Sequence, residues 1–279
     1  MSPTGSRDAT RPTYDDAVTD RWIDLEGLAN MRDLGGLPTV DGGRTLSGRL
    51  IRSDNLQDLT DADISRLVGD LGVSDVVDLR SDTELHLEGP GPLRRVESLV
   101  HHHHHSLAAE HRARSADEVA RHALLVREAG DRSPKDHAFW AQHYLGYLDR
   151  RPDSVSAALR VVAEADGAVV VHCAAGKDRT GTVVALALEV AGVPRHEIVA
   201  DYVLSAERID AIIERLLPRE AYGPVLRHEH VDEQTPQAQA VTRVLDALAD
   251  QWGGATGWLL GHGWSEDDVD RLRTRLTGS

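Results

Sequence analysis

The sequence predicts an α/β protein in which helices flank a mainly parallel central sheet. Helix and strand patterns follow one another: residues 60–72 carry apolar positions at helical spacing, and residues 74–79 follow as a strand. Every residue of 168–171 is apolar, as is typical of a strand covered on both faces. Almost every residue of 181–193 is apolar as well, which predicts a buried helix soon after that strand.

The remaining patterns predict one domain with extra helices at its C-terminal end. A strand is expected over 48–53, and the five histidines from His101 to His105 are expected to extend an edge strand. Further helices are predicted over 115–128, 137–150, 153–165, 196–217 (as one helix or two), 237–248 and after Ser265, with a break at 218–235. Residues 1–20 are polar without periodicity, which predicts a disordered leader before a single domain of residues 21–279.

Charge and cysteine content exclude several classes of function. The chain carries 46 acidic and 31 basic side chains, a net charge of −15, which argues against nucleic acid as a partner. Its single cysteine excludes an intrachain disulfide and a cysteine metal cluster. No apolar signal core and no apolar run of about 18 residues occur, so we expect no stable membrane insertion. The expected location is the cytoplasm, and export by a route without a signal peptide is the open alternative.

The segment between the strand at 168–171 and the helix at 181–193 carries the chemistry. Cys173 and Arg179 stand six residues apart, with Gly176 between them and Thr180 directly after. A loop that closes onto a helix start turns backbone N–H groups inward, and the helix dipole adds positive charge, so a phosphoryl dianion can be held there. The same field lowers the pKa of a thiol and favours the nucleophilic thiolate. The alternative for Cys173 is a small buried hydrophobe, which leaves the other three residues unexplained.

Each neighbour in this loop has an expected role. Arg179 presents a planar fork that takes two phosphate oxygens at once. Thr180 can donate its hydroxyl to the sulfur and make it a better leaving group. His172 is expected to orient the loop and not to act as the general base. Lys177 either adds a second positive charge at the rim of the loop or is simply solvated.

This segment resembles the signature loop of the cysteine-dependent tyrosine phosphatase superfamily. More closely, Gly-Lys-Asp-Arg-Thr-Gly at 176–181 is similar to the loops of the bacterial tyrosine/serine protein phosphatase family. Residues 28–37 and 48–55 are similar to the N-terminal region of that family, so the resemblance covers most of 25–215. It implies a tyrosine-phosphatase-like fold and a cysteinyl-phosphate intermediate.

The resemblance also implies how substrate is held and covered. Ala174, Ala175, Gly176 and Lys177 are expected to bind the phosphoryl group. In the resembled family, helices beyond the loop can cover the site as a lid. A fixed packing layer would give the same amphipathic pattern here. No cofactor is expected, and no metal is expected at the site. The run of histidines at 101–105 could capture a transition metal adventitiously, but a catalytic metal calls for a carboxylate and fixed outer partners.

Two aspartates are candidates for the general acid that protonates the leaving oxygen. Asp178, inside the loop, is the first choice, as the family pattern implies, and the alternative is an ion pair that stiffens the loop. Asp82 follows the strand at 74–79 and is the second choice, against a solvated carboxylate in a turn. Farther away, Arg32, Asp33 and Arg52 either line the pocket or form a buried ion-pair network beneath it, and we favour the network.

The predicted function is hydrolysis of phosphomonoesters, foremost as a protein-tyrosine phosphatase that also accepts phosphoserine or phosphothreonine. A phosphoinositide or inositol-phosphate phosphatase is the alternative enzyme, and a phosphate-binding module without turnover is the alternative outside enzymes. The partner is therefore a phosphorylated protein or a phosphoinositide. The sequence does not predict an oligomeric state.

Overall fold

The computed structural model describes residues 21–108, 135–227 and 231–279. The predicted leader at 1–20 and the predicted helix at 115–128 lie outside these residues. A five-stranded sheet has the order β1-β2-β5-β3-β4, and all its neighbours are parallel except β1 and β2. Its strands are β1 (Arg32–Asp33), β2 (Leu50–Ser53), β3 (Val73–Asp78), β4 (His101–His104) and β5 (Ala168–His172). The prediction of a mainly parallel sheet is confirmed.

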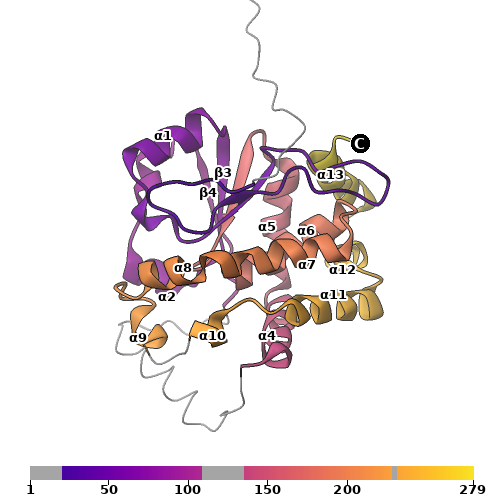
Figure 1. Cartoon of the computed structure of the whole chain (residues 1–279). Helices are drawn as coiled ribbons and strands as arrows, with labels where there is room; N and C mark the ends of the chain where they lie inside the picture. The colour runs from indigo at the N-terminus through magenta and orange to yellow at the C-terminus, as the bar shows by residue number, and fades with distance from the viewer. Residues whose placement is uncertain (1–20, 109–134, 228–230) are drawn as a thin grey trace, which may run out of the picture.

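Helices surround this sheet (Figure 1). They are α1 (Asp61–Gly69), α2 (Asp82–Glu88), α4 (His137–Arg150), α5 (Pro152–Glu164), α6 (Asp178–Val190), α7 (Arg195–Val203), α8 (Ile209–Leu216), α9 (Gly223–Leu226), α10 (Val231–Gln234), α11 (Ala238–Trp252), α12 (Ala255–Gly261) and α13 (Glu266–Thr277). Three short 3₁₀ helices are η1 (Leu56–Asp58), η2 (Pro92–Val96) and η3 (Leu204–Arg208). Helices α2 and α12 were not expected, and the predicted break at 218–235 contains α9 and α10.

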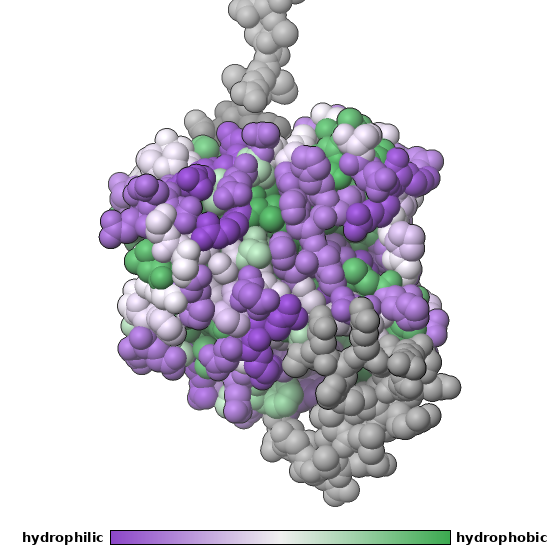
Figure 2. All heavy atoms as spheres, turned by 180° about the vertical axis from the view of Figure 1, so that it is seen from behind, coloured by the Kyte–Doolittle hydropathy of each residue, from purple (hydrophilic) through white to green (hydrophobic). Residues whose placement is uncertain are grey.

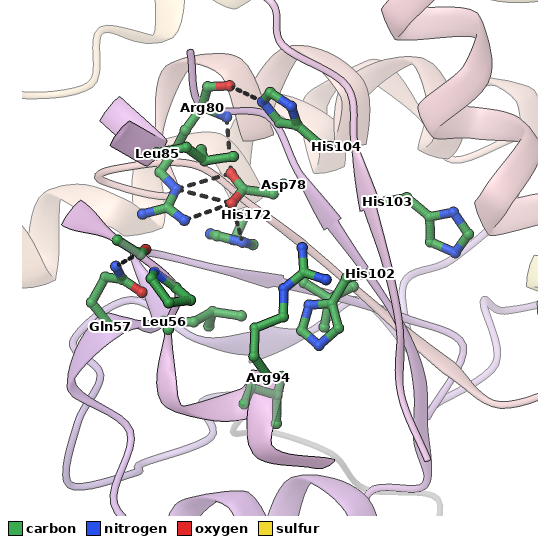
Figure 3. A pocket seen from close by; sticks show the side chains of 15 residues that line it. Leu56, Gln57, Asp78, Arg80, Leu85, Arg94, His102, His103, His104 and His172 are labelled. Atoms are coloured by element: carbon green, nitrogen blue, oxygen red, sulfur yellow. Dashed lines mark hydrogen bonds and ion pairs between the residues drawn. The ribbon is translucent and has the colours of Figure 1, made fainter. Parts of the chain in front are cut away.

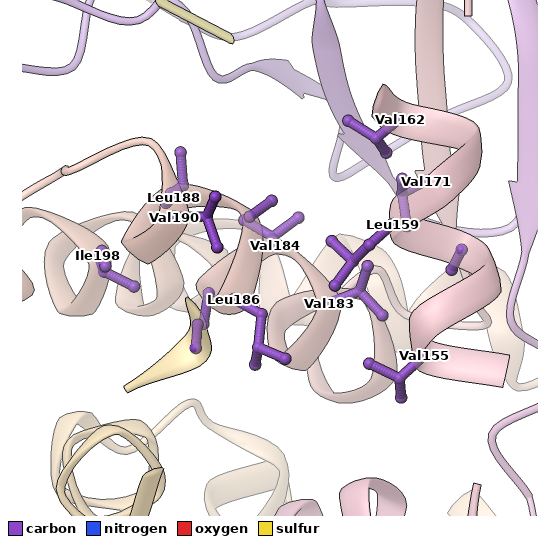
Figure 4. Close-up of a cluster of buried hydrophobic side chains, with 14 of the residues drawn as sticks. Val155, Leu159, Val162, Val171, Val183, Val184, Leu186, Leu188, Val190 and Ile198 are labelled. Atoms are coloured by element: carbon purple, nitrogen blue, oxygen red, sulfur yellow. The ribbon is translucent and has the colours of Figure 1, made fainter. Parts of the chain in front are cut away.

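The central strand β5 shows how the layers form. Side chains alternate along a strand, so Val169 and Val171 point to one face of the sheet while Ala168 and Val170 point to the other. The first face is covered by α4, α5, α6 and α11, and Figure 4 shows part of this core, where side chains of α5 and α6 meet β5. The second face is covered by α1, η1 and η2. Since β5 is buried on both faces, the loop that follows it starts from the most fixed part of the sheet.

Hydrogen-bonded caps fix several helix starts. Thr60 and Asp63 form a reciprocal capping box at α1, and Ser265 and Asp268 form one at α13. Helix α6 is different: Lys177 occupies its N-cap position, and its side chain makes no capping hydrogen bond. The exposed amides of that turn are therefore left for another partner.

The outer parts of the molecule agree with the polar composition. Strand β4 consists of four histidines, and among the described strands it pairs with β3 alone, so the expected edge strand is confirmed. Figure 2 shows one face of the molecule, where hydrophilic side chains predominate and hydrophobic ones form small separate areas. Throughout the described ranges, no helix has both the length and the apolar character needed to cross a bilayer.

Candidate active site

The loop from Cys173 to Lys177 joins β5 to α6 at the carboxyl edge of the parallel strands. Three of its carbonyl groups are bound from outside. The amide of Asn55 donates to the oxygen of Ala174 at 2.9 Å, and Nδ2 of Asn30 donates to the oxygen of Ala175 at 2.8 Å. Nη2 of Arg52 donates to the oxygen of Gly176 at 2.7 Å. Drawing consecutive carbonyls outward turns the amides of the same peptides toward the inside of the loop.

Those amides have no internal acceptor. Within the described ranges, no oxygen accepts a hydrogen bond from the backbone N–H groups of residues 174–179. Buried amides are nearly always paired in proteins, so a run of open donors at a helix start indicates a place for an anion. The dipole of the 13-residue helix α6 adds positive charge at the same point.

Gly176 is required by the shape of the loop. Its φ is +65°, a region that favours glycine, and a Cβ there would lie 2.5 Å from the carbonyl oxygen of Ser53. A side chain at this position would push the loop away from β2.

A buried cluster of charges lies beneath the loop. Asp201 of α7 receives Arg21 at 2.8 Å, Arg32 at 3.0 Å and Arg52 at 2.7 Å, and the side chains of Arg32 and Arg52 are almost completely buried. Burial alone would raise the pKa of Asp201, but Arg32 and the other two arginines hold it well below its usual range. The expected buried network is therefore confirmed for the two predicted arginines, with Asp201 as the partner that the sequence did not reveal.

Asp33, the third predicted member, has another function. Its carboxylate accepts hydrogen bonds from the amides of Gly35 at 2.8 Å and Gly48 at 2.7 Å. The carboxylate of Asp33 therefore fixes the two ends of the segment that joins β1 to β2 and does not join the arginines on Asp201.

Cys173 and Thr180 lie at the base of the loop. The side chain of Cys173 is 2% exposed and belongs to the main apolar core. Thr180 lies in the first turn of α6 and is fully buried, and in the described part of the chain its Oγ1 has no hydrogen-bond partner. A buried hydroxyl without a partner costs free energy. The open hydroxyl of Thr180 therefore indicates a partner that arrives with substrate or forms during the reaction.

Arg179 is held by a carboxylate that we did not predict. Nη1 and Nη2 of Arg179 bind the two carboxylate oxygens of Glu84 at 2.5 and 2.8 Å. Burial works against the charge of Arg179, but Glu84, with a smaller contribution from Cys173, raises the pKa of Arg179 far above its usual value. The guanidinium is thus fixed in orientation and permanently charged.

Asp178, the first-choice general acid, is held by a buried tyrosine. The hydroxyl of Tyr144 donates to Oδ1 of Asp178, and the hydroxyls of Tyr144 and Tyr202 lie 2.7 Å apart. Nζ of Lys177 lies 3.6 Å from Oδ2 of Asp178. The carboxylate is therefore fixed at the start of α6, one residue before Arg179.

Lys177 does not have the solvated position that was one of its two predicted alternatives. It is 2% exposed, because its side chain turns toward α10 and α4. Its Nζ donates to the backbone oxygen of Gln234 and lies 5.0 Å from the centre of the Trp140 ring. The solvated interpretation is wrong, and the ammonium is already engaged by groups of the protein.

Asp82, the second-choice acid, is the first residue of α2. Its Oδ1 lies 3.7 Å from Nδ1 of His104. Two residues later, Glu84 makes the contact with Arg179. The sequence contained a signal for this helix, since Ser81 and Glu84 form a capping box of the S-x-x-E type.

His172 lies directly before Cys173 and is buried. It is 2% exposed, its Nδ1 lies 3.3 Å from the carbonyl oxygen of Cys173, and its Nε2 lies 3.5 Å from Oδ2 of Asp78. Burial lowers the pKa of His172 to about 4, although Asp78 acts in the opposite direction.

Helix α8 covers one side of the loop. Ile209 and Ile212 of α8 share an apolar cluster with Ala174. Arg215, at the end of the same helix, binds Asp54 and also lies 3.0 Å from Asp58. These contacts describe a packed layer over the loop. Whether this layer also moves as a lid stays a prediction.

A metal site would need several ligands close together among the described residues. Among residues 21–108, 135–227 and 231–279, no group of three or more His, Cys, Asp or Glu side chains is arranged to hold a metal ion. This includes the histidines of β4, where His103 is bound to Asp75 at 2.8 Å.

Open amides at a helix start, a thiol below them and a fixed guanidinium define a class of protein that can hold a phosphoryl dianion against a cysteine. Comparison with known proteins agrees with this class. The tyrosine phosphatase family matches residues 23–278 of the chain. The chain therefore belongs to the tyrosine phosphatase family, a family of enzymes.

Named relatives cover most of the chain. A tyrosine-protein phosphatase of Nostoc commune is 31% identical over 231 residues, which are 81% of this chain and 73% of that protein. The triple specificity protein phosphatase PtpB of Mycobacterium tuberculosis is 32% identical over 278 residues, 91% of this chain and 99% of that protein. A putative tyrosine-protein phosphatase of Cupriavidus necator is 30% identical over 252 residues, 89% of this chain and 86% of that protein.

Proposed function

We propose that the protein removes the phosphoryl group from phosphotyrosine in proteins, and from phosphoserine or phosphothreonine as secondary substrates, through a cysteinyl-phosphate. The single observation that carries the proposal is the run of six open amides over Cys173, closed on one side by the fixed guanidinium of Arg179. An anion with three equatorial oxygens satisfies this many donors, as a transferring phosphoryl group does.

In the first step the thiolate of Cys173 attacks phosphorus, and the S–P bond forms as the P–O bond to the leaving group breaks. Arg179 and the amides hold the charge of the equatorial oxygens. In the second step water attacks phosphorus, the S–P bond breaks and inorganic phosphate leaves. The hydroxyl of Thr180 then has its missing partner in the departing sulfur. Because the thiol is 2% exposed in the resting structure, the surrounding side chains move before substrate reaches it.

The test of this proposal is the loss of turnover without loss of the fold. Cys173→Ser is expected to abolish hydrolysis of a phosphotyrosine peptide and of p-nitrophenyl phosphate, with an unchanged circular dichroism spectrum. Mass spectrometry of acid-quenched wild type is expected to detect phosphate on Cys173, and vanadate is expected to inhibit competitively. Retained hydrolysis by the serine variant, or phosphate trapped on another residue, would overturn the proposal.

Asp178 is proposed as the acid that protonates the leaving oxygen and then as the base that activates water. The hydroxyl of Tyr144 keeps one of its oxygens in place, and we assign the proton to the other oxygen, which lies 3.6 Å from Nζ of Lys177. Asp178→Asn is expected to lower kcat by about 100-fold on phenyl phosphate, a poor leaving group, and by much less on p-nitrophenyl phosphate, whose leaving group needs little protonation. Equal losses on both substrates would remove Asp178 from the acid role, and Asp82→Asn tests the second choice in the same way.

The phosphoinositide alternative loses part of its support from the loop itself. A second positive charge at the loop rim would favour a phosphoinositide, but the ammonium of Lys177 is bound to the backbone oxygen of Gln234. Rates measured side by side on phosphotyrosine peptides and on soluble phosphoinositides decide between the two substrate classes. We expect the larger kcat/KM on the peptides.

A further inference from the structure

A second hollow lies behind the catalytic loop, between the ends of β3 and β4 and the segments η1, α2 and η2 (Figure 3). Its volume is about 310 Å³, at the lower end of the range of small-molecule pockets. Apolar side chains form much of its wall: Leu56, Val76, Leu85 and Leu93. We call this hollow the β3–β4 pocket.

The charged side chains around the β3–β4 pocket differ in whether they have a partner within the protein. Its one carboxylate, Asp78, is fully engaged, because Nε and Nη2 of Arg80 bind it at 2.9 and 2.6 Å. Arg94 differs from Arg80. Arg94 is exposed, and its side chain has no hydrogen bond or ion pair to any residue that the structure describes, although it lines the pocket. The pocket is therefore locally positive, in a chain whose net charge is −15.

A second unsatisfied group lies next to Arg94. Nε2 of His102 is buried and has no hydrogen-bond partner within the described residues. Figure 3 shows the guanidinium of Arg94 beside the His102 ring, with Asp78, Arg80 and His172 across the pocket from them. The neighbouring histidines are engaged, since His103 bonds to Asp75 and His104 to the carbonyl oxygen of Arg80. Arg94 and Nε2 of His102, both without a hydrogen-bond partner among the described residues, thus lie together on one wall of the hollow.

We propose that the β3–β4 pocket binds a small organic carboxylate with an apolar body. The carboxylate would accept two parallel hydrogen bonds from Arg94 and one from Nε2 of His102, in the tautomer or imidazolium that carries hydrogen there. The apolar body would cover the leucines and Val76 and release the water that now wets them. A cation is disfavoured by Arg94, and a bare inorganic oxyanion would leave the apolar wall uncovered.

This pocket is separate from the catalytic loop. His172 contributes to its wall, but the loop amides of residues 174–179 open away from it, as the outward carbonyls bound by Asn55 and Arg52 show. Binding in the β3–β4 pocket does not depend on the proposed phosphatase chemistry. It should persist in a Cys173→Ser variant.

Benzoate is the probe, titrated into the full chain by calorimetry and by ligand-observed NMR. We expect saturable binding at one site, about tenfold or more weaker binding for Arg94→Leu, and unchanged binding for Arg95→Leu. Arg95 is the matched control because it is adjacent, exposed and paired with Asp61 outside the pocket. Acetate, which lacks the apolar body, and benzamide, which lacks the charge, should each bind about tenfold or more weakly than benzoate.

Three results would overturn this inference. One is no benzoate binding to wild type. Another is equal loss in the Arg94 and Arg95 variants, which would indicate a general effect of surface charge. The third is displacement of benzoate by vanadate, which would place the ligand in the catalytic loop. None of these results bears on whether Cys173→Ser loses turnover, so the two proposals fail separately.

Discussion

Two arginine sites adjoin the loop from Cys173 to Lys177, a buried one at Asp201 and a half-buried one at Arg179, and they use the same chemistry differently. Asp201 binds three arginines at once, and Arg52 also holds the carbonyl of Gly176, so the hydrogen-bonding capacity of this cluster is used inside the protein. Arg179 has a single carboxylate partner, Glu84. Beside Arg179 lie amides without acceptors and the hydroxyl of Thr180 without a partner.

The difference in pairing distinguishes a site that supports the backbone from a site that can bind a ligand. The arginines of the Asp201 cluster bind a carboxylate and backbone carbonyls of the protein itself, so the cluster supports the backbone, although Nε of Arg52 has no partner among the described residues. A site with one fixed charge and several open donors is incomplete until an anion enters. We infer that the Asp201 cluster determines stability and the Arg179 site determines turnover, and each prediction below tests that division.

The largest expected effect is on stability, from Asp201→Asn. This change leaves Arg32 and Arg52 buried without their carboxylate, and breaking a buried ion pair on one side costs about 3–5 kcal/mol. Urea unfolding followed by circular dichroism measures the loss. Asp246→Asn is the matched control, because Asp246 pairs with Arg195 at an exposed position and should change stability by less than about 0.5 kcal/mol. A loss below about 1 kcal/mol for Asp201→Asn would contradict the structural role.

A slightly smaller effect is expected from pH, through His172, a buried group that stays uncharged between the two arginine sites. Its pKa of about 4 in the folded chain lies below the ordinary value of 6.5, so between these values only the unfolded chain binds the proton. Stability should therefore fall as pH is lowered from about 6.5 to about 4, by up to about 3 kcal/mol. Urea unfolding across this range should show a shallower slope for His172→Gln. Parallel profiles for the two proteins would contradict the assignment.

The smallest expected effect concerns Glu84 and falls on turnover. Glu84→Gln keeps the capping box of α2, since glutamine also serves at that position, but removes the charge that aligns Arg179. We expect kcat/KM on p-nitrophenyl phosphate to fall about tenfold, while stability changes by less than about 1 kcal/mol. Arg179→Lys should cost about 100-fold, because lysine lacks the fork. Adding Glu84→Gln to Arg179→Lys should then cost little more, and fully additive losses would contradict a positioning role for Glu84.

Much of the fold follows from local sequence patterns. The all-apolar run that predicted β5, the capping residues Thr60 and Ser265, and the five histidines of the edge strand each correspond to an element of the structure. Helix α6 begins three residues earlier than predicted, because its first turn consists of Asp178, Arg179 and Thr180. Apolar periodicity cannot detect a turn whose side chains serve the loop.

The missed features share a physical reason. Helix α2 buries none of its residues, so hydrophobic spacing gave no signal for it, and with it Glu84 was overlooked. Asp201 has partners 149 and 169 residues away, and no local pattern marks such a convergence. Helix α12 contains Gly257 and Gly261, which argue against a helix, and it forms because Trp258 and Leu259 are buried in the main core.

The single sulfhydryl of this chain has a practical consequence. A thiol-directed reagent has one point of attachment, so any label on the chain reports on Cys173 alone. Since Cys173 is 2% exposed, the folded protein should be labelled only as fast as local opening of the structure exposes its sulfur. The labelling rate then measures how often the motion occurs that gives a phosphorylated side chain access to Cys173.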